Sequence, residues 1–192
     1  MKNKSLEDIV IGLKNQYKTG TYGSIRDGVY VKEILYEFEE VKLFDGKAAV
    51  MLPIVFEDMP ERAAKIKYPN RNRPQVIKTN HDGSINFCFS MLEHQLSEEE
   101  IAPMSDEIKN VLKKLQPADV FYTENVEKTQ TNTFAWFTYQ NYSMDGKIFN
   151  HMFTTVVDGQ MVQGMFNCPA REMELWKYVM KDVMLTFQDR TK

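Results

Sequence analysis

The chain has 192 residues, 43% of them hydrophobic, so it is long and apolar enough to bury a substantial core as one domain. Its formal net charge of −3 gives no reason to expect nucleic-acid binding, and its two cysteines are too few for a disulfide framework. No segment has the length and apolar composition of a membrane span, and the first residues lack the apolar run of a signal peptide. We therefore expect a cytoplasmic protein without membrane contact, although a trimmed signal peptide would leave the same sequence.

The N-terminal part of the chain predicts an appendage. Ser5 can cap a helix over Ser5–Tyr17, where apolar residues recur at helical spacing. Three glycines then predict a loop over residues 18–29. We expect residues 1–28 to form this helix and loop, and residues 29–192 to form a single domain.

The next segment predicts a hairpin followed by a short helix. Val29–Leu43 and Lys47–Val55 are expected to be strands joined at Asp45-Gly46, with a bulge or an edge position in the first. Pro60–Lys67 has proline at its first position and predicts a short helix. The prolines of Tyr68–Pro74 disfavour helical backbone before them, which predicts an extended loop.

A second hairpin and a helix follow. Gln75–Thr79 and Ile85–Leu92 are expected to pair across Asn80–Gly83. Ser97 begins a capping-box pattern, so a helix should start there or restart at Ser105, beyond Pro103. Its expected apolar face is Ile108, Val111, Leu112 and Leu115.

The last part of the chain predicts a strand, a meander of three strands and a long helix. A strand over Val120–Glu127 leads into strands over Thr131–Tyr142, Lys147–Val157 and Gln160–Cys168, joined by Asp145-Gly146 and Asp158-Gly159 turns. Counting from these turns pairs Tyr142 with Phe149, Gln140 with His151, and Phe153 with Gly164. One face carries Phe134, Trp136, Phe149, Phe153, Val157, Val162 and Phe166, and the other carries Phe137, Tyr139, Met152, Val156, Met161 and Met165.

Because both faces are apolar, both should be covered, and the amphipathic segment after Pro169 can cover one. Hairpins dominate and no strand–helix–strand alternation occurs. We expect an α+β fold: an α/β/α sandwich around a mainly antiparallel sheet of about six to eight strands, with a long C-terminal helix.

This layout resembles the PsbP-like superfamily, which also holds the Mog-type nuclear import factors and several bacterial families of unknown function. The resemblance spans residues 30 to 187. The features that carry it are Tyr68-Pro69 at the entry to a hairpin, the long helix after it, Asp145-Gly146-Lys147 in the meander, and Asn167-Cys168-Pro169 before the Trp176 helix. It implies an α/β/α sandwich whose known members mostly bind other proteins rather than catalyse reactions. It supplies no functional residues, because the superfamily lacks a shared catalytic motif.

The sequence contains no recognisable catalytic, phosphate-binding or dinucleotide-binding motif, and the spacing of its histidines and cysteines predicts no metal site. We expect no cofactor. Two residues remain reactive candidates of low weight. Cys168 precedes a helix whose N-terminus would lower its pKa, and His151 is expected mid-sheet beside Gln140 as a possible base. A hydrogen-bonded structural histidine is the simpler interpretation of His151.

The expected register places Asn141, Asn150 and Asn167 opposite one another on three adjacent strands, with Tyr139 and Gln163 nearby. Each amide offers donors and an acceptor, so this row could hold a ligand or a partner's backbone, or could tie the strands together.

The other candidate contact is the extended loop. Tyr68, Arg71 and Arg73 lie in or beside it, within a basic stretch of the chain. Guanidinium groups on such a loop can reach an acidic partner, although ordinary solvated surface would have the same composition.

These observations lead to one main hypothesis and two alternatives. The main hypothesis is a non-enzymatic binding or adaptor protein that contacts another protein. The first alternative is a small-molecule binder or hydrolase with a cleft at the Asn141, Asn150 and Asn167 end of the sheet. The second is a secretion-system accessory or immunity factor, which the small acidic chain permits.

Overall fold

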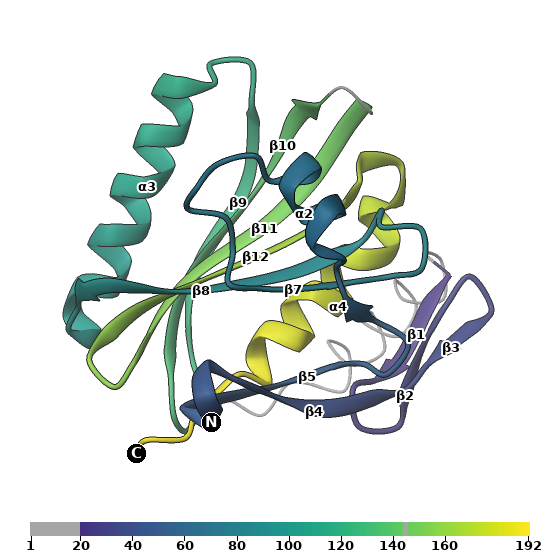
Figure 1. The fold of residues 1–192 in the computed structure, drawn as a ribbon, viewed down its shortest axis with the longest axis horizontal. Coiled ribbons are helices and arrows are strands. Elements are labelled where there is room, and N and C mark those ends of the chain that lie inside the picture. Colours follow the sequence, from purple (N-terminus) through teal and green to yellow (C-terminus); the bar gives the residue numbers. More distant parts are fainter. Residues whose placement is uncertain (1–19, 144–145) are drawn as a thin grey trace, which may run out of the picture.

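The centre of the protein is a seven-stranded antiparallel sheet, seen in a computed structural model that describes residues 20–143 and 146–192. Its strand order is β6-β7-β8-β12-β11-β10-β9 (Figure 1). The strands are β6 (Glu57–Asp58), β7 (Val76–Thr79), β8 (Asn86–Gln95), β9 (Val120–Lys128), β10 (Thr133–Ser143), β11 (Gly146–Val157) and β12 (Gln160–Pro169).

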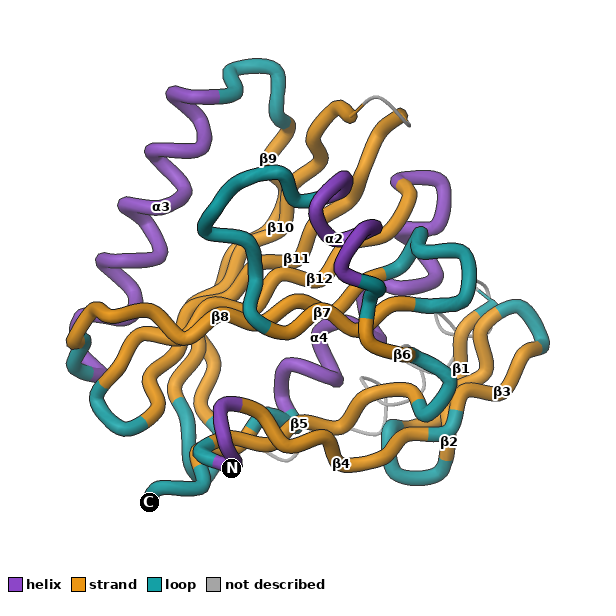
Figure 2. The backbone as a smooth tube through the Cα atoms, viewed as in Figure 1, coloured by secondary structure: helices purple, strands orange, loops and turns teal. Residues whose placement is uncertain are grey.

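Helices cover both faces of this sheet. On one face, α2 (Glu61–Lys67) packs over Ile77 and Cys88, and α3 (Ile101–Leu115) packs over Ala135, Val156 and Met161. On the other face, α4 (Met173–Leu185) buries Trp176, Val179, Met180, Val183 and Met184. Figure 2 shows α2 and α3 apart from each other on their shared side, with a long loop between α2 and β7. The predicted fold class is therefore confirmed.

Two small sheets form a further layer that the sequence did not predict. One has the order β13-β5-β4, from β4 (Phe38–Leu43), β5 (Ala48–Pro53) and β13 (Gln188–Asp189). The other is β1 (Thr21–Ser24), β2 (Gly28–Val31) and β3 (Ile34–Tyr36). Val31 and Val50 from these sheets lie in one buried cluster with Met180 of α4 and Phe153 of β11. Helix α4 therefore lies between the large sheet and the small sheets, as Figure 1 shows for β4 and β5.

The described residues also include three short 3-10 turns: η1 (Phe44–Gly46), η2 (Glu98–Glu100) and η3 (Ala170–Glu172).

The predicted register of the meander is correct for one pair of strands, β11 and β12, and wrong for the other, β10 and β11. Between β11 and β12 it agrees throughout, with Phe153 opposite Gly164 and His151 opposite Phe166. Between β10 and β11 the prediction is wrong by two residues, because Ser143 pairs with Gly146 and Tyr142 therefore pairs with Lys147. A shift of two preserves which face each side chain occupies. The predicted apolar faces therefore hold, and Phe134, Trp136, Phe149 and Phe153 are all buried on the α4 side.

The N-terminal predictions need correction. The predicted helix over Ser5–Tyr17 lies outside the described residues. Residues 18–29 were expected to be a loop, yet β1 occupies Thr21–Ser24. The single strand expected over Val29–Leu43 is three strands, because Lys32 and Glu33 adopt positive φ angles and turn the chain back between β2 and β3. This reversal explains why the residues of that segment alternate poorly.

Helix α3 begins with the expected capping box, but its predicted apolar face is more exposed than expected. The Ser97 capping box is present, and the helix runs from Ile101 through Pro103, which occupies its first turn. Its buried residues are Ile101 and Ser105, whereas Ile108 and Leu112 of the predicted apolar face are only half-buried. Val111 is 46% exposed and Leu115 is 68% exposed, because the C-terminal half of α3 projects away from the sheet (Figure 1).

Gly164 provides a test of the sheet packing. A Cβ atom added there would lie 2.0 Å from Cε1 of Phe153, the residue directly opposite on β11. We expect Gly164→Ala to lower the free energy of unfolding by about 2–3 kcal/mol, as overpacked cores do. Urea denaturation measures the change.

Gly46→Ala is the matched control, because a Cβ there meets nothing within 4 Å. Its φ of +85° should cost about 1 kcal/mol. Equal losses for the two variants would contradict the packing described at Gly164.

Candidate functional site

A ladder of asparagines crosses the α2 side of the sheet. Its members are Asn86 on β8, Asn167 on β12, Asn150 on β11 and Asn141 on β10, and we call them the amide ladder. Asn86 Nδ2 donates to Asn167 Oδ1 at 2.8 Å, and Asn150 Nδ2 donates to Asn141 Oδ1 at 3.0 Å. Asn150 and Asn167 are directly opposed, as predicted. Asn141 is displaced by the register difference and lies opposite Ile148, so it meets Asn150 diagonally.

The sequence analysis missed Asn86. It lies opposite Asn167 on the next strand and is fully buried. The pairing of β8 with β12 joins segments far apart in the sequence, and no turn signal fixes it. Asn150 and Asn167 are also buried, so three of the four side chains are withdrawn from solvent. Buried amides are costly unless they are hydrogen-bonded, and here they largely satisfy one another and the backbone.

The ladder ends on Tyr68, at the base of the loop after α2. The Tyr68 hydroxyl oxygen accepts hydrogen bonds from Asn167 Nδ2 at 3.1 Å and from Cys88 Sγ at 3.3 Å. Thr79 Oγ1 donates to Asn86 Oδ1 at 2.8 Å on the same side. Burial raises the pKa of Tyr68 well above its usual range. Tyr68 is therefore a fixed anchor, and the loop that it begins is tied to the centre of the sheet.

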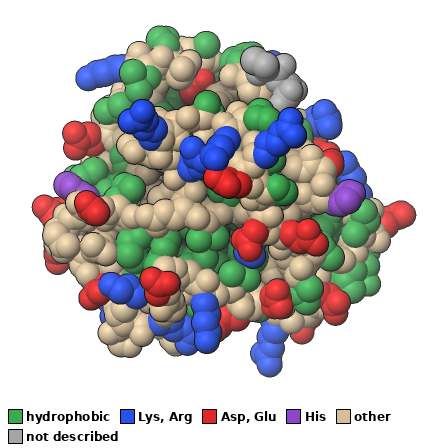
Figure 3. Space-filling view, viewed as in Figure 1, with side chains coloured by type: hydrophobic (Ala, Val, Ile, Leu, Met, Phe, Trp, Pro, Cys, Tyr) green, Lys and Arg blue, Asp and Glu red, His purple; other side chains and the backbone are tan. Residues whose placement is uncertain are grey.

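Beyond this anchor the loop is open to solvent. Arg71 is exposed, and Asn72 N–H donates to Asn70 Oδ1 at 3.1 Å, which shapes the tip of the loop. Arg73 is half-buried, and its Nε atom is buried without a partner within the described residues. Figure 3 shows lysine and arginine side chains gathered over α2 and this loop.

Two cations of this basic region are paired locally, Lys65 with Glu61 at 2.5 Å and Lys78 with Asp58 at 3.0 Å. Within the described ranges Arg71 forms no ion pair. The positive charge at the tip of the loop is thus presented to solvent rather than offset by a neighbour.

Tyr139 and Gln163 were expected beside the asparagines. Tyr139 lies directly opposite Asn150, is buried, and stacks on Phe121 with ring centroids 5.3 Å apart. Gln163 lies on the same face but opposite Thr154, so it is outside the ladder. It is half-buried.

His151 and Cys168 lie on the other face, buried under α4. The His151 ring stacks on Trp136 at 5.0 Å, and its Nε2 lies 3.4 Å from Met184 Sδ. The expected contact with Gln140 is wrong, since Gln140 pairs with Phe149. Burial, aided by the charge of Lys181, lowers the pKa of His151 to about 3, so the ring is neutral at physiological pH.

The environment of Cys168 also differs from the expectation. Burial raises the pKa of its thiol, with the Glu172 carboxylate acting in the same direction, whereas a helix N-terminus was expected to lower it. Cys168 lies opposite Phe149 and His151 lies opposite Phe166, so two aromatic residues stand at the positions between them. A thiol and an imidazole so placed do not form a nucleophile–base pair.

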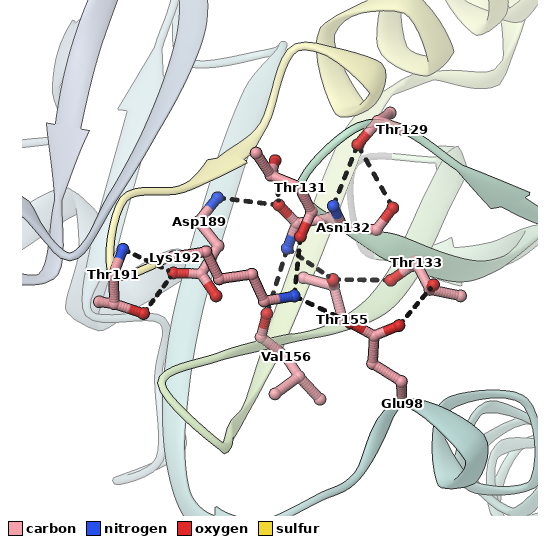
Figure 4. Close-up of polar contacts among 10 residues, drawn as sticks. All are labelled: Glu98, Thr129, Thr131, Asn132, Thr133, Thr155, Val156, Asp189, Thr191 and Lys192. Atoms are coloured by element: carbon pink, nitrogen blue, oxygen red, sulfur yellow. Dashed lines mark hydrogen bonds and ion pairs between the residues drawn. The ribbon is translucent and has the colours of Figure 1, made fainter.

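A second polar network holds the C-terminal strand (Figure 4). Asn132 Oδ1 accepts from Asp189 N–H at 2.8 Å, and Asn132 Nδ2 donates to Thr155 Oγ1 and to the Val156 carbonyl, both at 3.1 Å. Lys192 Nζ reaches Glu98 Oε1 at 2.8 Å. These bonds join β13 to β10, β11 and the start of α3, and their role is to close the fold.

Two surface hollows lie elsewhere than the ladder. One, of about 310 Å³, is lined by α3, β9 and β10, among them Ser105, Lys109 and Glu124. The other, of about 330 Å³, is lined by η1 and the end of β8, among them Phe44 and Met91. Neither is lined by a ladder asparagine. Within the described residues, no three side chains of the metal-binding types are grouped to hold an ion. The described helices include none with the length and apolar character of a membrane span.

Removing the centre of the ladder tests its structural role. Asn167→Ala removes the 2.8 Å bond from Asn86 Nδ2 and the 3.1 Å bond to the Tyr68 hydroxyl, which then keeps only its contact with Cys88, so we expect a loss of about 2–3 kcal/mol in the free energy of unfolding. Trypsin should also cut the native protein faster after Arg71. Gln163→Ala, on the same strand and face, should change both quantities little, by about 0.5 kcal/mol or less. Similar behaviour of the two variants would show that the ladder does not anchor the loop.

His151 predicts a pH dependence of stability. Its folded pKa of about 3 lies below the ordinary 6.5, so the unfolded chain binds a proton that the folded chain excludes between these values. Stability due to this residue is fully present above pH 6.5 and is lost as pH falls, by about 1.4 kcal/mol per unit. His151→Phe should remove this slope, measured as the difference between variant and wild type in urea unfolding at successive pH values. A difference that does not vary with pH would contradict the burial of a neutral ring.

Comparison with known proteins identifies the fold. No family model matches the sequence, and neither does any curated protein. Among solved structures, the cyanobacterial PsbP (CyanoP) of Synechocystis aligns with a TM-score of 0.58 at 8% identity, over 79% of this chain and 92% of that one. The Ran-binding protein Mog1p of Saccharomyces cerevisiae aligns with 0.52 at 12% identity, over 80% and 96%. LpqN of Mycobacterium tuberculosis, described as involved in cell envelope biogenesis, aligns with 0.54 at 9% identity, over 98% of both chains. The chain therefore has the fold shared by PsbP and Mog1p, as the sequence resemblance implied.

Proposed function

We propose that this protein is a non-enzymatic binding or adaptor protein that contacts an acidic surface of another protein through the loop Tyr68–Pro74. The observation that carries the proposal is the anchoring of Tyr68 by the amide ladder. A loop fixed at Tyr68 by hydrogen bonds and exposed at Arg71 presents a charged group from an anchored base.

The physical argument concerns the cost of ordering. A loop that is already held in place loses less conformational entropy when a partner binds, so more of the interaction energy appears as affinity. The Arg71 guanidinium can form two parallel hydrogen bonds to one carboxylate, which adds direction to the attraction. Acidic groups on the partner would thus be both attracted and oriented.

The fold is consistent with this role. Mog1p, which shares it, is described as a Ran-binding protein. That description concerns Mog1p alone, and its identity of 12% supports only the general use of this fold in protein contacts. The partner proposed here is defined by its acidic surface, and the proposal includes no nucleic acid, membrane or cofactor.

The enzymatic alternative receives less support from the geometry. A hydrolase at the asparagine end would need amides turned toward a cleft, but those of the ladder are bonded to one another and to Tyr68. It would also need a reactive thiol or base. The pKa of Cys168 is raised and that of His151 is lowered, so neither group is prepared for such chemistry at neutral pH.

Charge reversal at the loop tests the proposal. Arg71→Glu should reduce the capture of partner proteins from a lysate of the native host by roughly fivefold or more at low salt, because an attraction becomes a repulsion. The difference should shrink at high salt, where exposed charges are screened. Affinity capture followed by quantitative mass spectrometry provides the measurement.

Arg26→Glu is the control, since Arg26 is an equally exposed arginine between β1 and β2. Its capture profile should match that of the wild type. Identical profiles for all three proteins would show that the loop is not the contact.

A further inference from the structure

On the side facing β7, the C-terminal half of β8 has no neighbouring strand among the described residues. Strand β7 pairs with Asn86–Phe89, and no described strand lies beside Ser90–Gln95 on that side of the sheet. An unpaired edge presents backbone N–H and C=O groups that another extended chain can bind.

One side chain occupies the first position along this open edge. Gln75 Nε2 donates to the Met91 carbonyl at 2.9 Å, and Gln75 Oε1 accepts from Met91 N–H at 3.2 Å. The Gln75 backbone N–H also donates to the Phe89 carbonyl at 3.1 Å, so the sequence of bonds continues the β7 ladder. A carboxamide that bonds both backbone groups of one residue takes the place of one peptide unit of a neighbouring strand.

A groove of about 330 Å³ adjoins this edge, with Gln75, Met91 and Glu93 on its β8 side and Phe44 and Asp45 on the other. Figure 3 shows a strip of hydrophobic side chains between β7–β8 and β4–β5. Phe44 and Met91 line the groove, are half-buried and pack on the main core. Phe44 and Asp45 both have positive φ angles, an uncommon backbone for such residues, and this turn holds Phe44 over the groove.

The charged residues at the rim of the groove favour a basic ligand. Lys47 is paired with Asp158 at 2.8 Å, whereas Asp45 and Glu93 are exposed and form no ion pair within the described residues. The groove therefore has a net negative rim. Met91 and Glu93 both line the groove, on either side of the start of the β8 irregularity that follows Met91.

We propose that the β8 edge and the groove beside it bind an extended, basic peptide segment of a partner protein, which adds to β8 as a strand after displacing the Gln75 side chain. The segment places an apolar side chain against Met91 and Phe44, and a lysine or arginine farther along it against Glu93. This inference rests on the proposed protein-binding function and supplies a second contact, with chemistry opposite to that of the Arg71 loop.

The test uses a fluorescent peptide of about eight residues, the length of an ordinary strand, that alternates threonine with lysine and valine in turn. Fluorescence anisotropy with the full chain should show saturable binding. Gln75→Ala should tighten binding about fivefold, because the peptide no longer competes with the side chain for Met91. Glu93→Lys should weaken binding severalfold, and Glu107→Lys, an exposed site on α3, should leave it unchanged.

Two further controls separate strand addition from simple charge attraction. The same peptide with alternate backbone amides N-methylated keeps its charge but cannot complete a ladder, so its binding should be lost. Hydrogen exchange of the Met91 amide in Gln75→Ala should be fast alone and slow with the peptide bound. Absent binding, equal binding of the N-methylated peptide, or unchanged exchange at Met91 would each overturn the proposal.

The outcome is distinguishable from that of the Arg71 experiment. Arg71→Glu should not weaken binding of this basic peptide, while it should reduce capture of an acidic partner. Loss of the peptide result alone overturns the groove proposal, and loss of the Arg71 result alone overturns the loop contact.

Discussion

An asparagine side chain that leaves water must find partners for its carbonyl oxygen and its N–H groups, and this requirement governs the α2 side of the sheet. The amide ladder meets it through bonds between neighbouring strands and a bond to Tyr68. A slip of one residue in β12 would move Asn167 to the α4 face, among phenylalanines, and leave Asn86 unpaired. The ladder thus fixes strand alignment as well as contributing energy, and the same bonds hold the base of the exposed loop. On the opposite, mostly apolar face under α4, the buried His151 ring is accommodated by staying neutral.

Short-range signals in the sequence predicted much of the fold correctly. The Asp158-Gly159 turn gave the β11–β12 register correctly, and the alternation of apolar residues gave both sheet faces. The β10–β11 register failed because the turn was placed at Asp145-Gly146, whereas Gly146 is already paired with Ser143. The face assignment survived because the error was an even number of residues. Asn150 and Asn167 were placed opposite each other because the β11–β12 register was correct, whereas the β10–β11 error left Asn141 diagonal to Asn150.

What the sequence could not reveal depends on contacts between distant segments. Asn86 completes the ladder through the pairing of β8 with β12, and the Gln75 side chain meets Met91 through the pairing of β7 with β8. The apolar residues near the end of α3 follow a helical pattern that predicts burial, yet Val111 and Leu115 are exposed. The hairpin across Asp45-Gly46 was expected and is present as β4 and β5, but the β1–β3 sheet was missed, because the reversal at Lys32–Glu33 has no glycine to signal it. Periodicity identifies which side of a helix or strand is apolar, but it does not identify the element that packs against that side.

The placement of β13 has a consequence for biosynthesis. Its residues Gln188 and Asp189 pair with Ala49 and Ala48 of β5. Asp189 N–H donates to Asn132 Oδ1, and Lys192 Nζ donates to Glu98 Oε1. The ribosome delivers β4 and β5 long before their closing strand exists, so during translation the small sheet has a bare edge and α4 is not yet present to support it. The nascent chain must pass through a state in which Val50 and Leu52, later fully enclosed, have no permanent cover. This sheet is completed by β13, which follows every other described strand in the chain, and until β13 is made the open edge of β5 can pair with another chain.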